Sequence, residues 1–295
     1  MRAALSALDV ARPRDLGHAL ELLHASVAGG RLVPLAGGTD LFVMLNSGQV
    51  PGRRFLDLWG LRELRGVRER DGRLVLGALT TFSEIREHAL VRRRYPALAA
   101  AAAEVGVWQI QNRGTLGGNI ANASPAGDSL PVLLALEAVV HARSVRGPRE
   151  IPFTSLFRGY RDLALEPDEL IVAVSVPPAP ARAKQFFRKV GTRRAQSISK
   201  VALAGLLRLG RDGRVDLARV ALGRVAPVTL RAGRAERALL GARPSVAATA
   251  AARAALLEDI APIDDIRSDR EYRRRVSGNV LEQFLRAAEP RFARR

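Results

Sequence analysis

The spacing of apolar side chains divides the first 60 residues into helices and short strands. Leucine and alanine side chains fall on one helical face over residues 13–27, which predicts an amphipathic helix. Residues 31–36 form a short apolar strand that ends in a glycine turn at residues 37–40. Helical spacing resumes over residues 41–45, and residues 53–58 predict a second strand.

From about residue 60 the pattern changes to short strands joined by tight turns. Asp71-Gly72 lies between two strand-like runs, residues 66–70 and 73–78, and predicts a two-residue hairpin turn. Thr81 and Glu84 have the spacing of a capping box that opens a short helix. Further elements are predicted as an Ala-rich helix over residues 96–105, an apolar helix over 130–136 and a strand over 170–176.

The segment Pro177-Pro178-Ala179-Pro180 is stiff and predicts a domain boundary. Beyond it the pattern predicts an antiparallel sheet followed by helices. The strands are expected over residues 184–190, 200–209 and 215–223, and the helices over about 233–240, 245–257 and 268–287. The chain is therefore predicted to be an α+β protein with one domain over residues 1–177, in subdomains of about 1–60 and 61–177, and a second over 178–295.

Composition excludes several kinds of chemistry. The 295-residue chain contains no cysteine, so it cannot form disulfides, thiolate zinc sites, cysteine-ligated iron–sulfur clusters or a cysteine nucleophile. No apolar run approaches the roughly 18 residues that a membrane span requires. The N-terminal residues show no apolar signal core, and we expect a cytoplasmic protein with no membrane span.

The net charge of +18 raises the possibility of nucleic-acid binding. The positive charge is diffuse, however, and comes almost entirely from arginine. Arginine runs such as 92–94 and 273–275 have no interleaved aromatic side chains on which bases could stack. We expect a solvated or partner-facing basic surface and no nucleic-acid partner.

Two glycine-rich segments carry the candidate chemistry. Gly37-Gly38-Thr39 follows a strand and opens a helix, so its backbone N–H groups could face a phosphate. Gly114-Thr115-Leu116-Gly117-Gly118-Asn119 is a second such loop, within residues 109–128, a polar and nearly uncharged segment. Two loops of this kind from different subdomains could hold a diphosphate from both sides, which predicts a dinucleotide ligand.

Other nucleotide and catalytic motifs are absent from the sequence. The chain lacks the P-loop pattern, and the second loop has neither the spacing nor the strand-to-helix context of the dinucleotide-binding fold. The four histidines are scattered, and we interpret them as surface or core residues. The carboxylates form no paired-acid signature, so no hydrolase chemistry is predicted and no catalytic residue or metal ligand is assigned.

Three segments resemble the FAD-binding medium subunits of molybdenum hydroxylases, such as carbon monoxide dehydrogenase, and the equivalent flavin domain of xanthine dehydrogenase. They are residues 36–41, residues 112–121 with 123–128, and residues 159–161 with 166–171. The resemblance implies a two-subdomain FAD-binding domain of the vanillyl-alcohol-oxidase (PCMH) type, followed by a smaller C-terminal α+β domain.

The resemblance also implies a set of FAD-binding residues. The two glycine loops would hold the diphosphate, Asp128 would be a polar ligand and Ile171 would line the flavin. Lys189 would lie near the flavin ring, with a surface salt bridge as the alternative, and Tyr160 would pack near the flavin or in the core. Asp40 would cap the helix that follows the first loop. The full set is Pro34, Leu35, Ala36, Gly37, Gly38, Thr39, Asp40, Leu41, Val105, Thr115, Leu116, Gly117, Gly118, Asn119, Ser124, Asp128, Tyr160, Ile171 and Lys189.

The resemblance implies an electron-transfer subunit of a larger complex. Substrate would be oxidised on a molybdopterin-binding large subunit, and an iron–sulfur small subunit would pass electrons through FAD to NAD or another acceptor. The absence of cysteine agrees with clusters in other chains. The alternatives are a free-standing FAD-dependent oxidase or reductase, which would act directly on a small substrate, and a non-enzymatic basic interaction protein.

Overall fold

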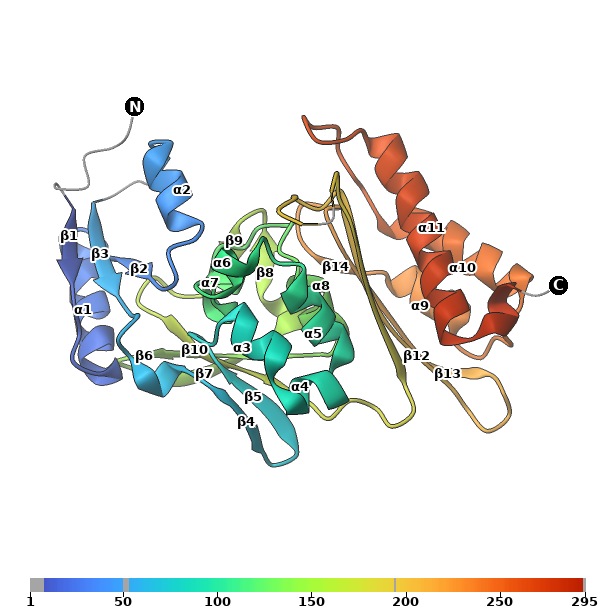
Figure 1. Ribbon diagram of the computed structural model, residues 1–295, viewed down its shortest axis with the longest axis horizontal. Coiled ribbons are helices and arrows are strands. Elements are labelled where there is room, and N and C mark those ends of the chain that lie inside the picture. Colours follow the sequence, from blue (N-terminus) through green and yellow to red (C-terminus); the bar gives the residue numbers. More distant parts are fainter. Residues whose placement is uncertain (1–7, 50–52, 194, 294–295) are drawn as a thin grey trace.

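The computed structural model describes residues 8–49, 53–193 and 195–293. Within these ranges, helices combine with a parallel sheet, two larger antiparallel sheets and a short two-stranded ribbon (Figure 1). This mixture agrees with the α+β class that the sequence predicts.

The N-terminal part is a small parallel sheet in the order β1-β3-β2, with helix α1 connecting β1 to β2. Asp15 caps α1, because its Oδ1 accepts a hydrogen bond from His18 N at 2.8 Å. The predicted helices and strands of this part are confirmed, whereas β1 is too short to give a sequence signal. The elements are β1 (Asp9–Ala11), α1 (Leu16–Gly29), β2 (Val33–Leu35), α2 (Leu41–Asn46) and β3 (Arg54–Asp57).

The middle part contains a five-stranded antiparallel sheet in the order β4-β5-β10-β6-β7. The predicted turn between β4 and β5 is confirmed, since Asp71 and Gly72 have φ angles of 51° and 72°. Positive φ at both positions is what a two-residue hairpin of this type requires. The strands are β4 (Val67–Arg70), β5 (Arg73–Gly77), β6 (Val139–Ser144), β7 (Gly147–Pro152) and β10 (Leu170–Val176).

Short helices pack on this sheet and form the main apolar core with it. The capping box of α3 is confirmed: Thr81 Oγ1 accepts from Glu84 N, and the Glu84 carboxylate accepts from Thr81 N. The elements are η2 (Arg62–Leu64), α3 (Phe82–Glu87), α4 (Ala89–Arg94), α5 (Pro96–Ala103), α6 (Trp108–Gln111), α7 (Leu116–Ala121), α8 (Leu130–Ala135), η3 (Phe153–Ser155), β8 (Phe157–Gly159) and β9 (Asp162–Leu163).

The C-terminal part is an antiparallel sheet in the order β11-β12-β13-β14, followed by helices, as predicted. In the described part of the chain, no helix is long and apolar enough to cross a membrane. The elements are β11 (Lys184–Val190), β12 (Val201–Leu209), β13 (Val215–Gly223), β14 (Leu230–Arg231), α9 (Gly233–Leu239), α10 (Val246–Asp259), α11 (Arg270–Ala288) and η4 (Pro290–Ala293).

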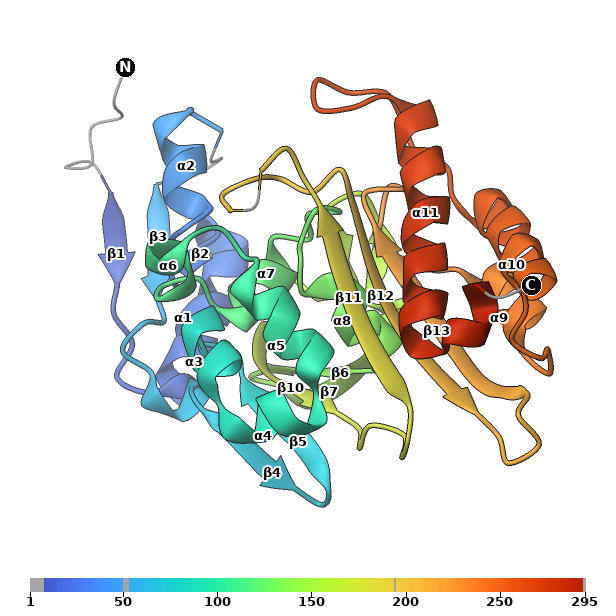
Figure 2. The ribbon, with the colours of Figure 1, turned by 45° about the vertical axis from the view of Figure 1, so that its right-hand side comes forward.

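This second large sheet stands between two layers of helices (Figures 1 and 2). Along β12, Leu203 and Leu207 belong to the core shared with α9, α10 and α11. The alternate residues Ala204 and Leu206 belong to the core shared with α5 and α8. Because both faces of β12 are buried, its sequence is an almost continuous apolar run.

Gly205 on β12 yields a prediction about the packing of α11. A Cβ atom at this position would lie 2.6 Å from the Phe284 ring, which is itself fully buried. The variant G205A should therefore lose about 1–3 kcal/mol of unfolding free energy through overpacking. Urea unfolding followed by circular dichroism measures the loss. G29A is the matched control, because a Cβ atom at Gly29 meets nothing within 4 Å. Equal midpoints for the two variants would contradict the packing.

Candidate functional site

The first glycine loop leads from β2 into α2. Among the described residues, none accepts a hydrogen bond from the backbone N–H groups of residues 37–40. Gly38 has a φ angle of 77°, in the left-handed region that glycine tolerates best, whereas Gly37 does not. The loop therefore presents a row of free N–H donors at the start of a helix, as the sequence predicts for an anion site.

The second glycine loop is not the irregular segment that the sequence suggests over residues 109–128. It contains helix α7, whose N-cap is Thr115, with the Oγ1 atom accepting from Gly118 N at 3.1 Å. Two bonds hold the helix start against the end of β5: Leu116 N donates to Thr80 O at 3.0 Å, and Gly117 N donates to Ala78 O at 2.8 Å. The N–H of Thr115 has no acceptor among the described residues.

The fold brings the two loops into direct contact. A Cβ atom on Gly37 would lie 1.8 Å from the carbonyl oxygen of Arg113, just before the second loop. A Cβ atom on Gly114 would lie 3.5 Å from Thr39 Oγ1. In Figure 2, α6 and α7 accordingly lie beside the end of the small parallel sheet. The two loops therefore lie directly against each other.

One expectation about these loops is corrected, and two of their glycines have a packing role. Asp40 occupies the N-cap position of α2, but its side chain makes no capping hydrogen bond, so the predicted capping role is wrong. Protein packing also requires glycine at position 117, because a Cβ atom there would lie 2.7 Å from Ala78 Cβ. Glycine is required at position 37 for the same reason, because a Cβ atom there would collide with the backbone of Arg113.

A buried ion pair lies at the other end of the predicted site. Lys189 Nζ on β11 donates to Asp128 Oδ2 at 2.6 Å and to Glu104 O at 2.9 Å. Both side chains are buried, and each residue is 8% exposed. This arrangement is a buried pair, so the surface salt bridge considered for Lys189 is wrong. The C-terminal sheet therefore supplies a side chain to the middle part of the molecule.

Asp128 has the most unusual electrostatic environment of this group. Burial raises the pKa of its carboxyl to about 6, and the charge and hydrogen bond of Lys189 oppose that rise. Its Oδ1 atom is buried and has no hydrogen-bond partner among the described residues. An unpaired buried acceptor of this kind is rare in proteins and is suited to a donor from a ligand.

The remaining predicted residues lie around these two centres. Asn119 Oδ1 accepts from Ser129 Oγ at 2.7 Å, next to Asp128 in sequence. Val105 is half-buried and follows Glu104, so it lies beside the Lys189 ammonium. Ser124 is half-buried in the same turn region, and its Oγ accepts from Ala126 N at 3.3 Å. Ile171 is buried in β10 within the main core.

Tyr160 lies apart from the core, at the turn between β8 and β9. It is 64% exposed, so the alternative of a core role is wrong. The neighbouring Arg161 places its Nη1 atom 4.0 Å from Met44 Sδ on α2. The turn therefore lies next to the helix that follows the first glycine loop, while no recorded contact joins Tyr160 to Asp128 or Lys189.

Sequence reasoning missed an aromatic–cation stack beside the loops. The guanidinium groups of Arg65 and Arg113 both lie over the ring of Trp59, which follows β3, at 4.1 and 3.6 Å from the ring centroid. Arg65 also donates to Trp59 O at 2.8 Å. The available signal was that Trp59 comes two residues after β3, the strand next to β2, at the carboxyl edge from which the first glycine loop also leaves.

Two family models match the chain. "FAD binding domain in molybdopterin dehydrogenase" matches residues 6–179, and "CO dehydrogenase flavoprotein C-terminal domain" matches residues 185–288. The first of these covers more than half of the chain.

Curated relatives of the same kind align over most of the chain. The xanthine dehydrogenase FAD-binding subunit of Escherichia coli O157:H7 is 34% identical over 256 residues, which are 86% of this chain and 87% of the relative. The carbon monoxide dehydrogenase medium chain of Hydrogenophaga pseudoflava is 31% identical over 281 residues, 95% of this chain and 96% of the relative.

Solved structures give the same result. A chain of carbon monoxide dehydrogenase from Hydrogenophaga pseudoflava superposes with a TM-score of 0.93 at 31% identity and covers 99% of both chains. A chain of quinoline 2-oxidoreductase from Pseudomonas putida 86 gives 0.90 at 27% identity, covering 99% of this chain and all of the other. The predicted fold class and family resemblance are confirmed. The chain belongs to the family of FAD-binding flavoprotein subunits of molybdenum hydroxylases, which are oxidoreductases.

Proposed function

We propose that this chain is the electron-transfer subunit of a heteromeric molybdenum hydroxylase, passing electrons from iron–sulfur clusters of a small partner subunit through FAD to NAD or another acceptor. A molybdopterin-binding large subunit would oxidise the substrate. Support comes from relatives named as medium chains and FAD subunits of dehydrogenases. The absence of cysteine from this chain also agrees with clusters held elsewhere.

The observation that carries the proposal is the contact between the two glycine loops. It brings residues 37–40, whose N–H groups are free, against the segment that contains Thr115, whose N–H group is also free. Backbone donors at helix starts favour phosphate oxygens, since their partial positive charge is fixed in place before binding. These donors, together with the side chains of Thr39 and Asn119, would hold the FAD diphosphate within residues 34–41 and 115–119.

The residues around Asp128 fit the other end of FAD. The unpaired Oδ1 atom of Asp128 would accept a hydrogen bond from a hydroxyl or N–H group of the cofactor. Lys189 would hold that carboxylate in place and keep positive charge near the flavin, which favours the reduced cofactor. When bound, FAD would supply the redox chemistry. Val105, Ser124, Ile171 and Tyr160 would complete the walls of the site.

Domain limits and location follow as further parts of the proposal. We place the FAD-binding domain over residues 1–177, with subdomains of about 1–60 and 61–177, and the C-terminal domain over 178–295. The linker is fixed in space, because Tyr95 Oη donates to Pro177 O at 3.0 Å. A cytoplasmic location remains a prediction.

Reconstitution with FAD tests the site. The purified chain should bind FAD, and G37A should bind it at least about tenfold more weakly, equivalent to about 1.4 kcal/mol, because the new methyl group forces the loops apart. Fluorescence titration of the flavin measures the affinity. G60A is the control, since a Cβ atom at Gly60 meets nothing within 4 Å. Wild-type affinity in a folded G37A variant would contradict the site.

Replacing Lys189 tests the buried ion pair through the pH dependence of the stability of the chain. Asp128 has a raised pKa, so its stabilising effect is complete below about pH 4 and is lost as the pH rises through about 6. In K189M the pKa of Asp128 should rise further, and this loss should move to higher pH. Unfolding of the FAD-free chain between pH 4 and 9 measures the change. The double variant D128N/K189M should show no such loss of stability with rising pH. Identical profiles of stability against pH for K189M and wild type would contradict the pairing.

The isolated chain should not be a complete enzyme. Loaded with FAD, it should oxidise no organic substrate in steady state, because the proposed function places substrate oxidation on another subunit. Reduction of an artificial dye by NADH would agree with the proposal that the FAD of this chain exchanges electrons with NAD. Steady turnover of xanthine, nicotinate or an aldehyde by the isolated chain would instead indicate a free-standing oxidase, and absorbance assays of each compound distinguish the two.

A further inference from the structure

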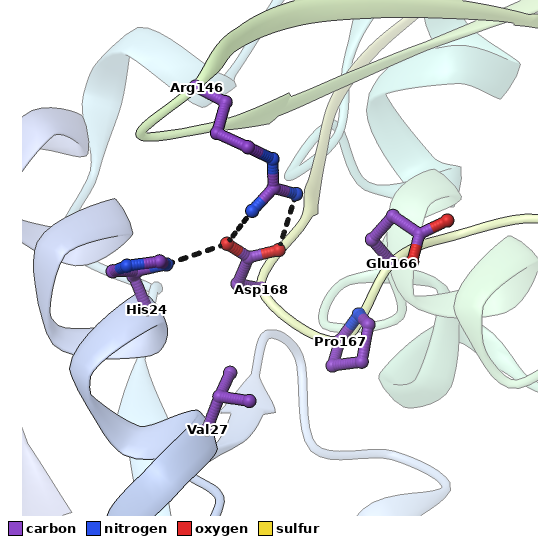
Figure 3. Close-up of a pocket in the computed structure, with 6 residues that line it drawn as sticks. All are labelled: His24, Val27, Arg146, Glu166, Pro167 and Asp168. Carbon is purple, nitrogen blue, oxygen red and sulfur yellow. Dashed lines mark hydrogen bonds and ion pairs between the residues drawn. The ribbon is translucent and has the colours of Figure 1, made fainter.

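A second cluster of charged side chains contains none of the residues predicted to bind FAD, of which the nearest in sequence, Ile171, lies three residues beyond Asp168. Asp168 lines a cavity of about 360 Å³ together with His24 and Arg146 (Figure 3). Arg146 donates through Nη1 to Asp168 Oδ2 at 2.5 Å and through Nη2 to Oδ1 at 2.7 Å. His24 Nδ1 lies 2.8 Å from Oδ2.

Asp168 is ionised in this arrangement. The residue is only 4% exposed, whereas the side chains of His24 and Arg146 are about half exposed. The hydrogen bonds from Arg146, with a further one from His24, hold the pKa of Asp168 at about 2. A carboxylate can only accept hydrogen bonds, so His24 donates from Nδ1. Glu166 is the other titratable group that lines the cavity.

The three side chains come from different parts of the fold. His24 is on α1, which belongs to the small parallel sheet. Arg146 is in the turn between β6 and β7, and Asp168 lies just before β10, so both belong to the five-stranded sheet. Leu170, at the start of β10, also packs with Leu20 and Leu23 of α1. Asp168 therefore joins the two halves of the proposed FAD-binding region through side chains that belong to neither glycine loop.

Both halves lead from this cluster to a glycine loop. On one side, α1 continues through β2 into the first loop. On the other, β10 runs on from Asp168, and its Val172 O accepts from Ala78 N at 3.0 Å. Ala78 O in turn accepts from Gly117 N in the second loop. A displacement at Asp168 would thus reach the first loop along the chain through α1 and β2, and the second loop through two backbone hydrogen bonds.

We propose that Asp168 is a positioning residue that fixes the two glycine loops relative to each other and so controls the retention of FAD without contacting it. The inference rests on the proposed function for its FAD readout. The geometric part stands independently, because loop placement can be measured in the FAD-free chain.

Trp59 provides that measurement. The chain has two tryptophans, Trp59 and Trp108, so a W108F background leaves Trp59 as the single reporter. Trp59 stacks on Arg113, which precedes the second loop, while Trp59 itself follows β3 of the first half. Its emission therefore responds to a change in the placement of the two halves at the loops, far in sequence from Asp168.

The central variant is D168N, which keeps the shape of the side chain but removes its charge. It should release FAD about tenfold faster than wild type at a temperature where circular dichroism shows both fully folded. In the W108F background without FAD, it should also change Trp59 emission. D168E keeps the negative charge, so its FAD release and its Trp59 emission should lie between those of D168N and wild type. D216N is the matched control, because Asp216 forms an arginine pair on the C-terminal sheet, with Arg208 Nε at 2.8 Å.

Each outcome decides a separate question. Wild-type FAD release and unchanged Trp59 emission in a folded D168N variant would overturn the positioning role, as would equal changes in D216N. If wild type binds no FAD, the proposed function fails, and Trp59 emission still decides the placement of the loops. If D168N does not fold, H24A and R146M take its place, since both side chains are half exposed. Each should accelerate FAD release about threefold, and unchanged release in both would overturn the proposal.

Discussion

The close approach of the first glycine loop to the backbone of Arg113 is the constraint on which the candidate site depends. At 1.8 Å from that carbonyl oxygen there is no space for any Cβ atom at Gly37. The two loops come from sheets that share no strand, so neither loop can acquire this geometry alone. The two loops therefore meet only when both halves of the region have folded and docked.

Features with local causes could be predicted from the sequence. The Asp71-Gly72 turn requires positive φ at two adjacent residues, and the Thr81 capping box requires side chains only three residues apart. Helix α7 could not be predicted in this way, because Gly117 and Gly118 disfavour a helix interior. Tertiary bonds from Leu116 and Gly117 to Thr80 and Ala78 hold it in place.

Side-chain roles that depend on distant partners were harder to predict. The sequence left Lys189 open between a flavin neighbour and a surface salt bridge, and its partner Asp128 is 61 residues away in another part of the fold. The predicted capping role of Asp40 was wrong for a related reason. Its position at the helix start was right, but sequence alone could not show that the helix N–H groups stay free of side-chain acceptors.

The C-terminal sheet contributes to the site through the rigidity of β12. Because both faces of β12 are buried, between α5 and α8 on one side and α11 on the other, the strand cannot slide without exposing an apolar face. β11 pairs with β12 along its full length, and this register places Lys189 opposite Ala202. The position of the buried cation is thus set by the core of one domain, while its carboxylate partner belongs to the other. Domain docking is therefore coupled to the integrity of the proposed FAD site, since Asp128 and Lys189 each lose their buried counter-charge if the domains separate.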